Sequence, residues 1–355
     1  MKTLKLIFQS IFSNEPIMQA RNQPWYIAII LFVVSILLAT YPTYTQILNR
    51  DGSTFLSGNT FSIENALVSF TEALEEEGVD LVVVSETIDG ETKYYLDNQG
   101  VNWDDAFTET LPSEEAFPYF EYTVNNVSRL RVFLQADDQT NEGVAEFVSR
   151  LLALPTGDDQ IGSFMLLTRS AVYMYVYNPA ALAEGSVNGE GFATAFTGTY
   201  DEVPLGTNLA NFVQVDLDGN VIDPNDVSEY VNLVFANWLN FFDQSFAYSK
   251  SVLLLAQSGL TLVVNAVMAL MMSIVIFIMT RGKLNPNNHF KFGETMKMGA
   301  WSLFSPALLT IVAGALFPEF AGTAFVLFVG LRLMWLSSKY LRPVDANVVP
   351  NTAKK

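Results

Sequence analysis

Four long apolar runs, separated by polar segments, dominate the pattern of hydrophobic positions along the chain. They occupy residues 25–42, 251–280, 298–318 and 319–338. A helix that crosses a bilayer needs about 20 mostly apolar residues, and each run comes close to that length or exceeds it. We therefore expect an α-helical membrane protein with four transmembrane helices. Residues 43–250 then form a domain inserted between the first and second helices.

The first apolar run has two interpretations, a cleaved signal peptide or an uncleaved membrane anchor. Lys2, Lys5 and Arg21 give it the basic flank that signal peptides carry. A cleavage site needs small residues, but the run ends in LLATYPTY, which offers Leu37 and Tyr41 instead. The sequence therefore favours an uncleaved anchor.

The inserted segment alternates between helical and strand-like spacing of apolar residues. Ser62 as N-cap and Gly78 as terminator predict a helix between them. Asp89-Gly90 between two β-rich runs predicts a hairpin. The remaining expected elements are a strand at 128–136, a helix at 143–155, a hairpin at 163–177 and an amphipathic helix at 227–250. Helices and strands that follow each other in mixed order, with the strands paired in hairpins, indicate an α+β domain.

Charge is distributed unevenly along the chain, and this predicts its orientation. Residues 1–24, 281–297 and 298–355 together hold 12 Lys and Arg against 4 Asp and Glu, whereas residues 43–250 hold 7 against 33. Basic segments beside transmembrane helices stay in the cytoplasm. We expect a cell-membrane protein with cytoplasmic termini, a cytoplasmic loop at 281–297, a cytoplasmic tail at 339–355 and an extracytoplasmic domain at 43–250.

Composition excludes several functional classes. The chain has no cysteine, and His289 is its one histidine, so thiolate and multi-histidine metal sites are excluded. A net charge of −18 disfavours nucleic acid as a partner. The chain contains no nucleophile elbow, phosphate-binding loop, dinucleotide fingerprint or kinase signature. We expect a protein that is not an enzyme, with no catalytic, cofactor-binding or metal-binding residues and no cofactor.

The stretch VQVDLDGNVIDPNDV, residues 213–227, is the strongest candidate for a cation site. Asp216, Asp218 and Asn220 match positions 1, 3 and 5 of a calcium loop. Glycine falls at position 4 rather than 6, however, and Val227 stands where a bidentate carboxylate is required. The favoured interpretation is a hairpin turn around Asp218-Gly219-Asn220, followed by Asp226 as a helix cap, with weak calcium binding as the alternative.

Other polar or aromatic clusters have plain structural interpretations. The acidic residues of 72–80 and 103–105 are typical of a solvated face. Tyr173, Tyr175 and Tyr177 alternate on one strand face, which suits packing or an interface better than stacking on a sugar.

Polar residues are few inside the apolar runs. Asn265, Ser302 and Ser305 lie within them, and Arg332 is expected to reach the interface near the cytoplasmic end of the fourth run. Ion-coupled carriers usually need an intramembrane carboxylate, so such a carrier is disfavoured. Small residues predict close helix contacts: Gly299, Ala300, Ala307, Ala313, Gly314 and Gly322.

Two stretches resemble a bacterial multi-pass membrane family of unknown function, some of whose members are labelled maltodextrin-utilisation proteins. These stretches are IFSNEPIMQARNQPWYIAIILFVVSILLATYP and FGETMKMGAWSLFSPALLTI, in which Ser305-Pro306 matches a Thr-Pro-like position. The family plan is one span, an extracytoplasmic domain and then a cluster of spans. The resemblance implies an accessory role beside an ABC-type sugar importer and no catalytic residues.

The leading functional hypothesis is therefore a non-enzymatic multi-pass membrane protein whose acidic outer domain binds a partner, such as the subunits of an ABC-type sugar (maltodextrin) importer. The lipid bilayer is the expected surrounding of its apolar helices. The alternative is an extracytoplasmic sensor or binding module for a small solute or cation. A membrane enzyme is a third class that only the abundance of acidic residues supports.

Overall fold

The structure is a computed structural model that describes residues 2–56, 60–88, 90–99, 119–125, 127–135, 163–178, 192–281, 285, 287–317 and 320–341. The chain divides into two compact units. Residues 50–251 form the outer unit, and residues 1–49 together with 252–355 form the helical unit.

In the part of the chain that the structure describes, four helices are long and apolar enough to cross a membrane, as predicted. The first is α3 (Trp25–Leu48), and the second lies in α8 (Val227–Met279). The third combines α9 (Phe292–Ser302) with α10 (Phe304–Leu316), and the fourth contains α11 (Ala321–Leu336) and the π-helical turn η5 (Ser337–Leu341). A β-sheet region stands between the first and second helices, which confirms the coarse fold class.

The helix boundaries differ from the apolar runs. Helix α3 continues through Pro42 to Leu48, and α8 joins the amphipathic segment at 227–250 to the second run without a break. The third helix begins at Phe292 and is interrupted at Leu303. Pro306 explains that interruption, because its ring clashes with the carbonyl four residues earlier, at Ser302, and it has no N–H to donate there.

Short helices precede the first long one and were not predicted. They are α1 (Lys2–Phe12), α2 (Glu15–Gln19) and the 3₁₀ turn η1 (Ala20–Asn22). Leu6 and Ile7 of α1 pack toward a core that contains Trp301, whereas Leu4, Phe8 and Phe12 form an exposed apolar stripe. The spacing of apolar residues in α1 is strongly amphipathic, so the sequence contained a helix signal that the interpretation of residues 1–24 as a basic flank did not use.

Small residues set some of the helix contacts in the helical unit, as predicted. A β-carbon at Gly299 would lie 1.9 Å from the hydroxyl oxygen of Ser273, so α8 and α9 approach closely there. Ala300 and Ala307 are buried. The prediction is wrong for Gly322, which has no neighbouring atom within 4 Å of a β-carbon built on it.

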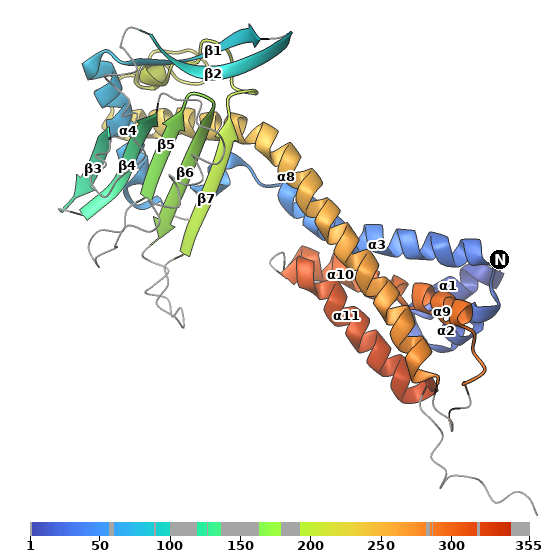
Figure 1. Cartoon of the computed structure of the whole chain (residues 1–355). Coiled ribbons are helices and arrows are strands. Elements are labelled where there is room, and N and C mark those ends of the chain that lie inside the picture. Colours follow the sequence, from blue (N-terminus) through green and yellow to red (C-terminus); the bar gives the residue numbers. More distant parts are fainter. Residues whose placement is uncertain are drawn as a thin grey trace, which may run out of the picture. The chain divides into compact units, whose positions relative to one another are not determined.

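The described residues of the outer unit form two sheets, which Figure 1 shows. The five-stranded sheet has the order β3-β4-β5-β6-β7, in which only β4 and β5 are parallel. The second sheet is the hairpin of β1 and β2. The strands are β1 (Asp80–Ile88), β2 (Glu91–Gln99), β3 (Phe120–Val124), β4 (Val127–Gln135), β5 (Ser163–Thr168), β6 (Ala171–Asn178) and β7 (Phe192–Thr199).

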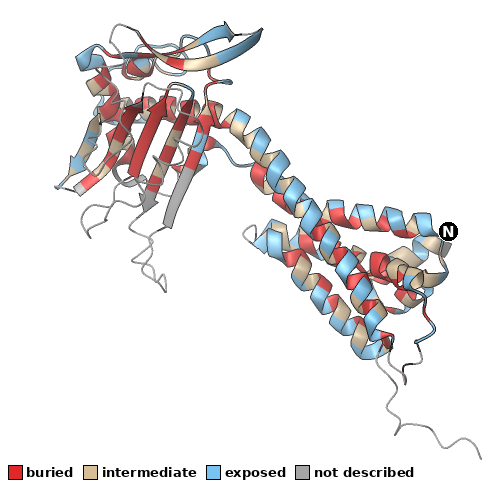
Figure 2. Ribbon diagram, viewed as in Figure 1, coloured by how far each residue is buried: buried red, intermediate tan, exposed pale blue. Residues whose placement is uncertain are grey.

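Helix α4 (Thr60–Glu77) and the first half of α8 pack against the larger sheet and form the core of the outer unit (Figures 1 and 2). Trp238 of α8 contacts Phe70 of α4, and Phe242 contacts Phe196 of β7 in an edge-on arrangement. Trp238 and Phe242 are fully buried. The apolar face of the first half of α8 is therefore used inside the outer unit.

Most expected elements of the outer unit are confirmed, with corrections at the ends. Helix α4 begins at Thr60, so Ser62 is not its N-cap, because the helix already contains it. Gly78 ends the helix with a φ of 66°, and the Val79 N–H donates to the carbonyl of Leu74 at 2.8 Å. Both hairpins and the strand at 128–136 are present. The expected helix at 143–155 lies outside the described residues.

Candidate functional site

The segment that follows β7 is fixed to the two sheets and forms one wall of a groove. The hydroxyl of buried Tyr200 donates to the carbonyls of Thr168 and Ala171, at 3.0 and 3.1 Å, and so holds the start of the segment to the β5–β6 turn. Further on, the Gly206 N–H donates to the Val83 carbonyl at 2.8 Å, and the Val83 N–H donates to the carbonyl of Thr207 at 2.9 Å. The segment is therefore fixed at both ends.

Asn208 continues this wall and starts the 3₁₀ helix η3 (Leu209–Val213). Its side-chain oxygen accepts a hydrogen bond from the Ala210 N–H at 3.1 Å, which is the usual role of asparagine at a helix start. Its side-chain nitrogen donates to a carboxylate oxygen of Asp80 at 2.7 Å. These two bonds use both ends of the amide and fix its orientation.

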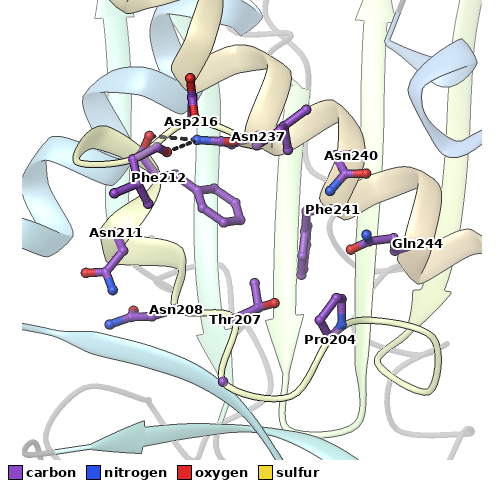
Figure 3. Close-up of a pocket in the computed structure, with 13 residues that line it drawn as sticks. Pro204, Thr207, Asn208, Asn211, Phe212, Asp216, Asn237, Asn240, Phe241 and Gln244 are labelled. Carbon is purple, nitrogen blue, oxygen red and sulfur yellow. Dashed lines mark hydrogen bonds between the residues drawn. The ribbon is translucent and has the colours of Figure 1, made fainter. Parts of the chain in front are cut away.

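Helix α8 supplies the opposite wall of the groove. Four lining residues recur at a spacing of three and four, which places them on one side of a helix; they are Asn237, Asn240, Phe241 and Gln244. The buried Asn237 amide donates to the carbonyls of Phe212 and Val215, at 3.0 and 2.7 Å, as Figure 3 shows. Asn237 therefore ties the loop wall to the helix wall.

Between these walls lies a cavity of about 260 Å³. Its lining consists of Pro204, Gly206, Thr207, Asn208, Asn211, Phe212, Val215, Asp216, Leu217, Asn237, Asn240, Phe241 and Gln244. Five of these residues bear an amide and two bear a phenyl ring. Figure 3 shows the two rings near the centre of the cluster with amide side chains around them. The lining therefore offers many hydrogen-bonding groups beside a small aromatic surface.

The two aromatic residues of the groove are held by the core beneath them. The ring centroids of Phe212 and Phe241 lie 6.3 Å apart, and both rings contact Trp238 edge-on. The indole N–H of Trp238 donates to the hydroxyl oxygen of Thr71 in α4 at 2.8 Å. The aromatic surface is therefore preformed rather than assembled by a ligand.

Three lining amides keep their hydrogen-bonding capacity. In the part of the chain that the structure describes, the side chains of Asn211, Asn240 and Gln244 make no hydrogen bond with protein. An amide both donates and accepts, so these groups suit a ligand that offers both functions, such as a hydroxyl or an amide. Amides do not exchange protons near neutral pH, so these three side chains could hold a ligand by hydrogen bonds but could not act as general acids or bases.

Asp216 is the one ionisable residue of the groove lining, and its carboxylate is already engaged. One oxygen accepts hydrogen bonds from the backbone N–H groups of Asp218 and Asn220, at 3.0 and 2.7 Å, and the other accepts from the Asn220 side chain at 3.0 Å. The hydrogen bonds from the side chain and backbone of Asn220 lower the pKa of Asp216 below its usual value. The groove therefore offers a neutral surface with one stabilised anion at its edge.

The predicted turn and cap in residues 213–227 are confirmed. A bridge pairs Val215 with Val221, and Gly219 adopts a φ of 81° in the turn between them. The strand arms are shorter than predicted, because only this bridge forms. An Asp226 side-chain oxygen accepts from the Glu229 N–H at 3.2 Å at the start of α8. Among the described residues, no group of three or more Asp, Glu and His could hold a metal ion.

The acidic segment 72–80 is only partly a solvated face. Glu72 accepts from the Tyr230 hydroxyl at 3.0 Å, and Glu75 accepts from the Gln214 amide at 2.9 Å. Burial and the neighbouring Glu72 raise the pKa of Tyr230. Two carboxylates of α4 thus accept hydrogen bonds from uncharged side chains, Tyr230 at the start of α8 and Gln214 after η3. The sequence did not suggest these contacts. Residues 103–105 lie outside the described residues.

The tyrosines of β6 serve packing, as predicted. Tyr175 stacks on Phe164 of β5 with ring centroids 5.1 Å apart, and Tyr173 packs on the same cluster. Burial raises the pKa of Tyr173. The side chain of Tyr177 lies outside the described part of the chain.

The polar residues of the apolar runs are buried between helices. The Asn265 amide donates to the hydroxyl oxygen of Thr40 at 3.3 Å, and Ser302 donates to the Gly299 carbonyl at 2.6 Å. Arg332 differs from its predicted role, since its guanidinium does not extend outward. It is buried and donates to the carbonyls of Ser10 and Ser13, at 2.5 and 2.9 Å. Ser10 lies in the last turn of the unpredicted α1, and Ser13 directly follows that helix.

The sequence contained one signal for the groove that was not used. Asn237, Asn240 and Gln244 place three amides on one face of a helix whose other face is aromatic. The loop wall had no signal of its own, because its position depends on hydrogen bonds to β1 and on Tyr200. Comparison with known protein families, with curated proteins and with solved structures finds no match for this chain.

Proposed function

We propose that the chain is a non-enzymatic integral protein of the cell membrane whose exported domain binds a small, neutral, polar solute. The four apolar helices supply spans of sufficient length. The distribution of basic residues supports cytoplasmic termini and an extracytoplasmic segment at 43–250. The outer unit, which spans residues 50–251, falls within that segment apart from its last residue.

The main support for solute binding is a set of amide side chains that make no hydrogen bond with the described protein residues. They lie in a cavity that also has a fixed aromatic surface. Asn240 and Gln244 can each donate to and accept from the same ligand, while Phe241 offers an apolar face. The lining has no lysine or arginine, and the inserted segment is strongly acidic. An anionic ligand would therefore be repelled, and a neutral one is favoured.

A thermal-unfolding screen of the purified protein tests this function. The probes are neutral mono- and disaccharides, zwitterionic amino acids and inorganic anions, each at millimolar concentration. We expect a neutral polar probe to raise Tm and inorganic phosphate to leave it unchanged. A ligand at a hundredfold excess over Kd stabilises the native state by about 2.7 kcal/mol, which is readily measured.

The double variant Asn240→Ala/Gln244→Ala should abolish the shift produced by such a probe. Asn232→Ala is the matched control, since it removes an exposed amide of the same helix whose nitrogen donates to the Ser228 carbonyl. A shift that survives the double variant would place the binding elsewhere. If no neutral probe shifts Tm, the solute-binding function is wrong.

The groove also bears on a second role, as an accessory subunit beside an ABC-type sugar importer. The resemblance of residues 11–42 and 292–311 to the maltodextrin-utilisation family suggests this partner. Amides around an aromatic surface suit a polyhydroxylated ligand, and a ligand of that kind is consistent with a role beside a sugar importer. Purification in a mild detergent tests the association, and recovery of the chain without any importer subunit would count against it.

A further inference from the structure

A second cavity, of about 510 Å³, lies in the helical unit between the last turn of α1, α10 and α11. Its lining is apolar except for Ser305 and Arg332. The main apolar contributors are Phe12, Leu309, Val312, Phe328, Leu331 and Trp335. Phe12, Leu309, Val312 and Leu331 are exposed, so the groove opens on the outer surface of this unit.

Arg332 gives this apolar groove a positive charge, and among the described residues no carboxylate forms an ion pair with it. Its guanidinium donates to the carbonyls of Ser10, Ile11 and Ser13, at 2.5, 3.4 and 2.9 Å, around the end of α1. The carbonyl end of a helix offsets only part of a unit charge. Arg332 is buried, with only 5% of its surface exposed. Its Nε nevertheless has no hydrogen-bond partner among the described residues.

The polar and apolar parts of the groove are separated along the helices. Ser305 and Arg332 stand at one end, together with the last turn of α1, whereas Val312 and Phe328 stand at the other. Ser305 and Val312 are seven residues apart on α10, which corresponds to roughly 10 Å at 1.5 Å per residue. The groove thus has a charged head and an apolar channel about two helical turns long.

We propose that this groove binds an anionic phospholipid, with the phosphate near Arg332 and an acyl chain along α10 and α11. The proposal rests on the proposed membrane location, because a bilayer supplies such molecules at this depth. The separation of charge from apolar surface matches a lipid better than a peptide, whose backbone would leave polar groups unpaired on an apolar wall. The unbalanced charge of Arg332 selects an anionic headgroup over a zwitterionic one.

The test uses the full chain, delipidated in a neutral detergent, with phosphatidylglycerol and phosphatidylcholine added separately. Lipid retained on the protein is counted by native mass spectrometry. We expect phosphatidylglycerol to bind about tenfold more tightly than phosphatidylcholine, the ratio that 1.4 kcal/mol gives. Equal retention of the two lipids would overturn the proposal.

Variants locate the binding and separate charge from shape. Leu309→Trp places a larger side chain in the groove and should reduce retention of phosphatidylglycerol about tenfold. Leu327→Trp is the matched control, because Leu327 is equally apolar and exposed on α11 but does not line the groove. Arg332→Gln should remove the preference for phosphatidylglycerol, and Arg332→Lys should retain it.

Retention that Leu309→Trp leaves unchanged would overturn the site even if the lipid preference is real. The membrane location itself is tested separately by extraction with alkaline carbonate. A chain released from membranes by that treatment would contradict the proposed function, whereas a chain that resists it but binds both lipids equally would contradict only the lipid site.

Discussion

Gly52 lies so close to Phe242 that a β-carbon at residue 52 would be 2.1 Å from the Phe242 carbonyl oxygen. The 3₁₀ turn η2 (Gly52–Phe55) is thereby pressed against the backbone of α8. Two polar contacts support the same junction. The Ser53 N–H donates to Asp243 at 2.6 Å, and the ammonium of Lys250 lies 3.0 Å from the Asp51 carboxylate. The two ends of the outer unit are therefore joined to each other.

Gly52→Ala should destabilise the outer unit, because the new methyl group has no space beside the Phe242 carbonyl. Overpacking of this kind costs roughly 1–3 kcal/mol, which thermal unfolding of the full chain would show as a lower Tm. Gly259→Ala is the control, since nothing lies within 4 Å of a β-carbon at that position in α8. Equal Tm values for the two variants would contradict the close contact.

The elements that could be predicted from the sequence are those formed by local contacts. Helix and hairpin periodicity is local, so α4, the β1–β2 hairpin and the β5–β6 hairpin could be predicted from spacing and turn residues. The parallel pairing of β4 with β5 and the position of β7 depend on contacts between distant residues, such as Gly198 against Ser245. The spacing of apolar residues along the chain does not predict which distant residues come into contact.

A fragment of residues 50–251 should fold without the helical unit. It contains the buried aromatic cluster of Trp238, Phe241 and Phe242 and the junction between Asp51 and Lys250. A shorter fragment of residues 55–245 lacks Gly52 and Lys250 and should unfold at a lower temperature, since the two ends are no longer held together. Circular dichroism melts of both fragments measure the difference. An aggregating or unfolded 50–251 fragment would show that the unit is not autonomous.

Introduced cysteines should report the proposed membrane orientation, and the native chain has none to interfere. Asp218 in the outer unit and Asn288 beside the second span are both exposed in the structure. In intact cells, an impermeant thiol reagent should label Asp218→Cys and spare Asn288→Cys until the membrane is permeabilised. The reverse pattern would invert the orientation.

Thr71→Val should destabilise the outer unit by removing the acceptor of the Trp238 indole N–H. A buried donor left without a partner costs roughly 1–3 kcal/mol, and Thr71 and Trp238 are both fully buried. Thr71→Ser retains the hydroxyl and should cost clearly less. Chemical denaturation of the two variants separates these outcomes, and a Val variant as stable as the Ser variant would show that the hydrogen bond contributes little.

The candidate groove shows why a binding site was harder to predict than the fold. Its helix wall follows from the spacing of Asn237, Asn240 and Gln244, but amphipathic helices commonly carry such amides on a solvated face. Only the loop from Pro204 to Leu217 converts that face into a cavity. The loop itself depends on buried hydrogen bonds from Tyr200 and Asn237, whose partners are far away in the sequence.

The Asp216 carboxylate should make the turn beside the groove sensitive to acid. Hydrogen bonds from Asn220 lower its pKa in the folded chain, so their contribution to stability is complete above the unfolded pKa of about 4 and is lost as the pH falls through the lower folded value. Asp216→Asn should therefore reduce Tm at pH 7, and this reduction should shrink as the pH falls below the unfolded pKa.

Asn220→Ala should raise the pKa of Asp216 toward its usual value, because it removes the side-chain donor at 3.0 Å. Carboxyl chemical shifts followed through a pH titration measure that change directly. Asp218→Asn is the matched control, since Asp218 is exposed in the same turn and contributes its backbone N–H rather than its carboxylate. A loss of stability with Asp218→Asn as large as with Asp216→Asn would mean that general charge repulsion, rather than the hydrogen bonds to Asp216, governs the turn.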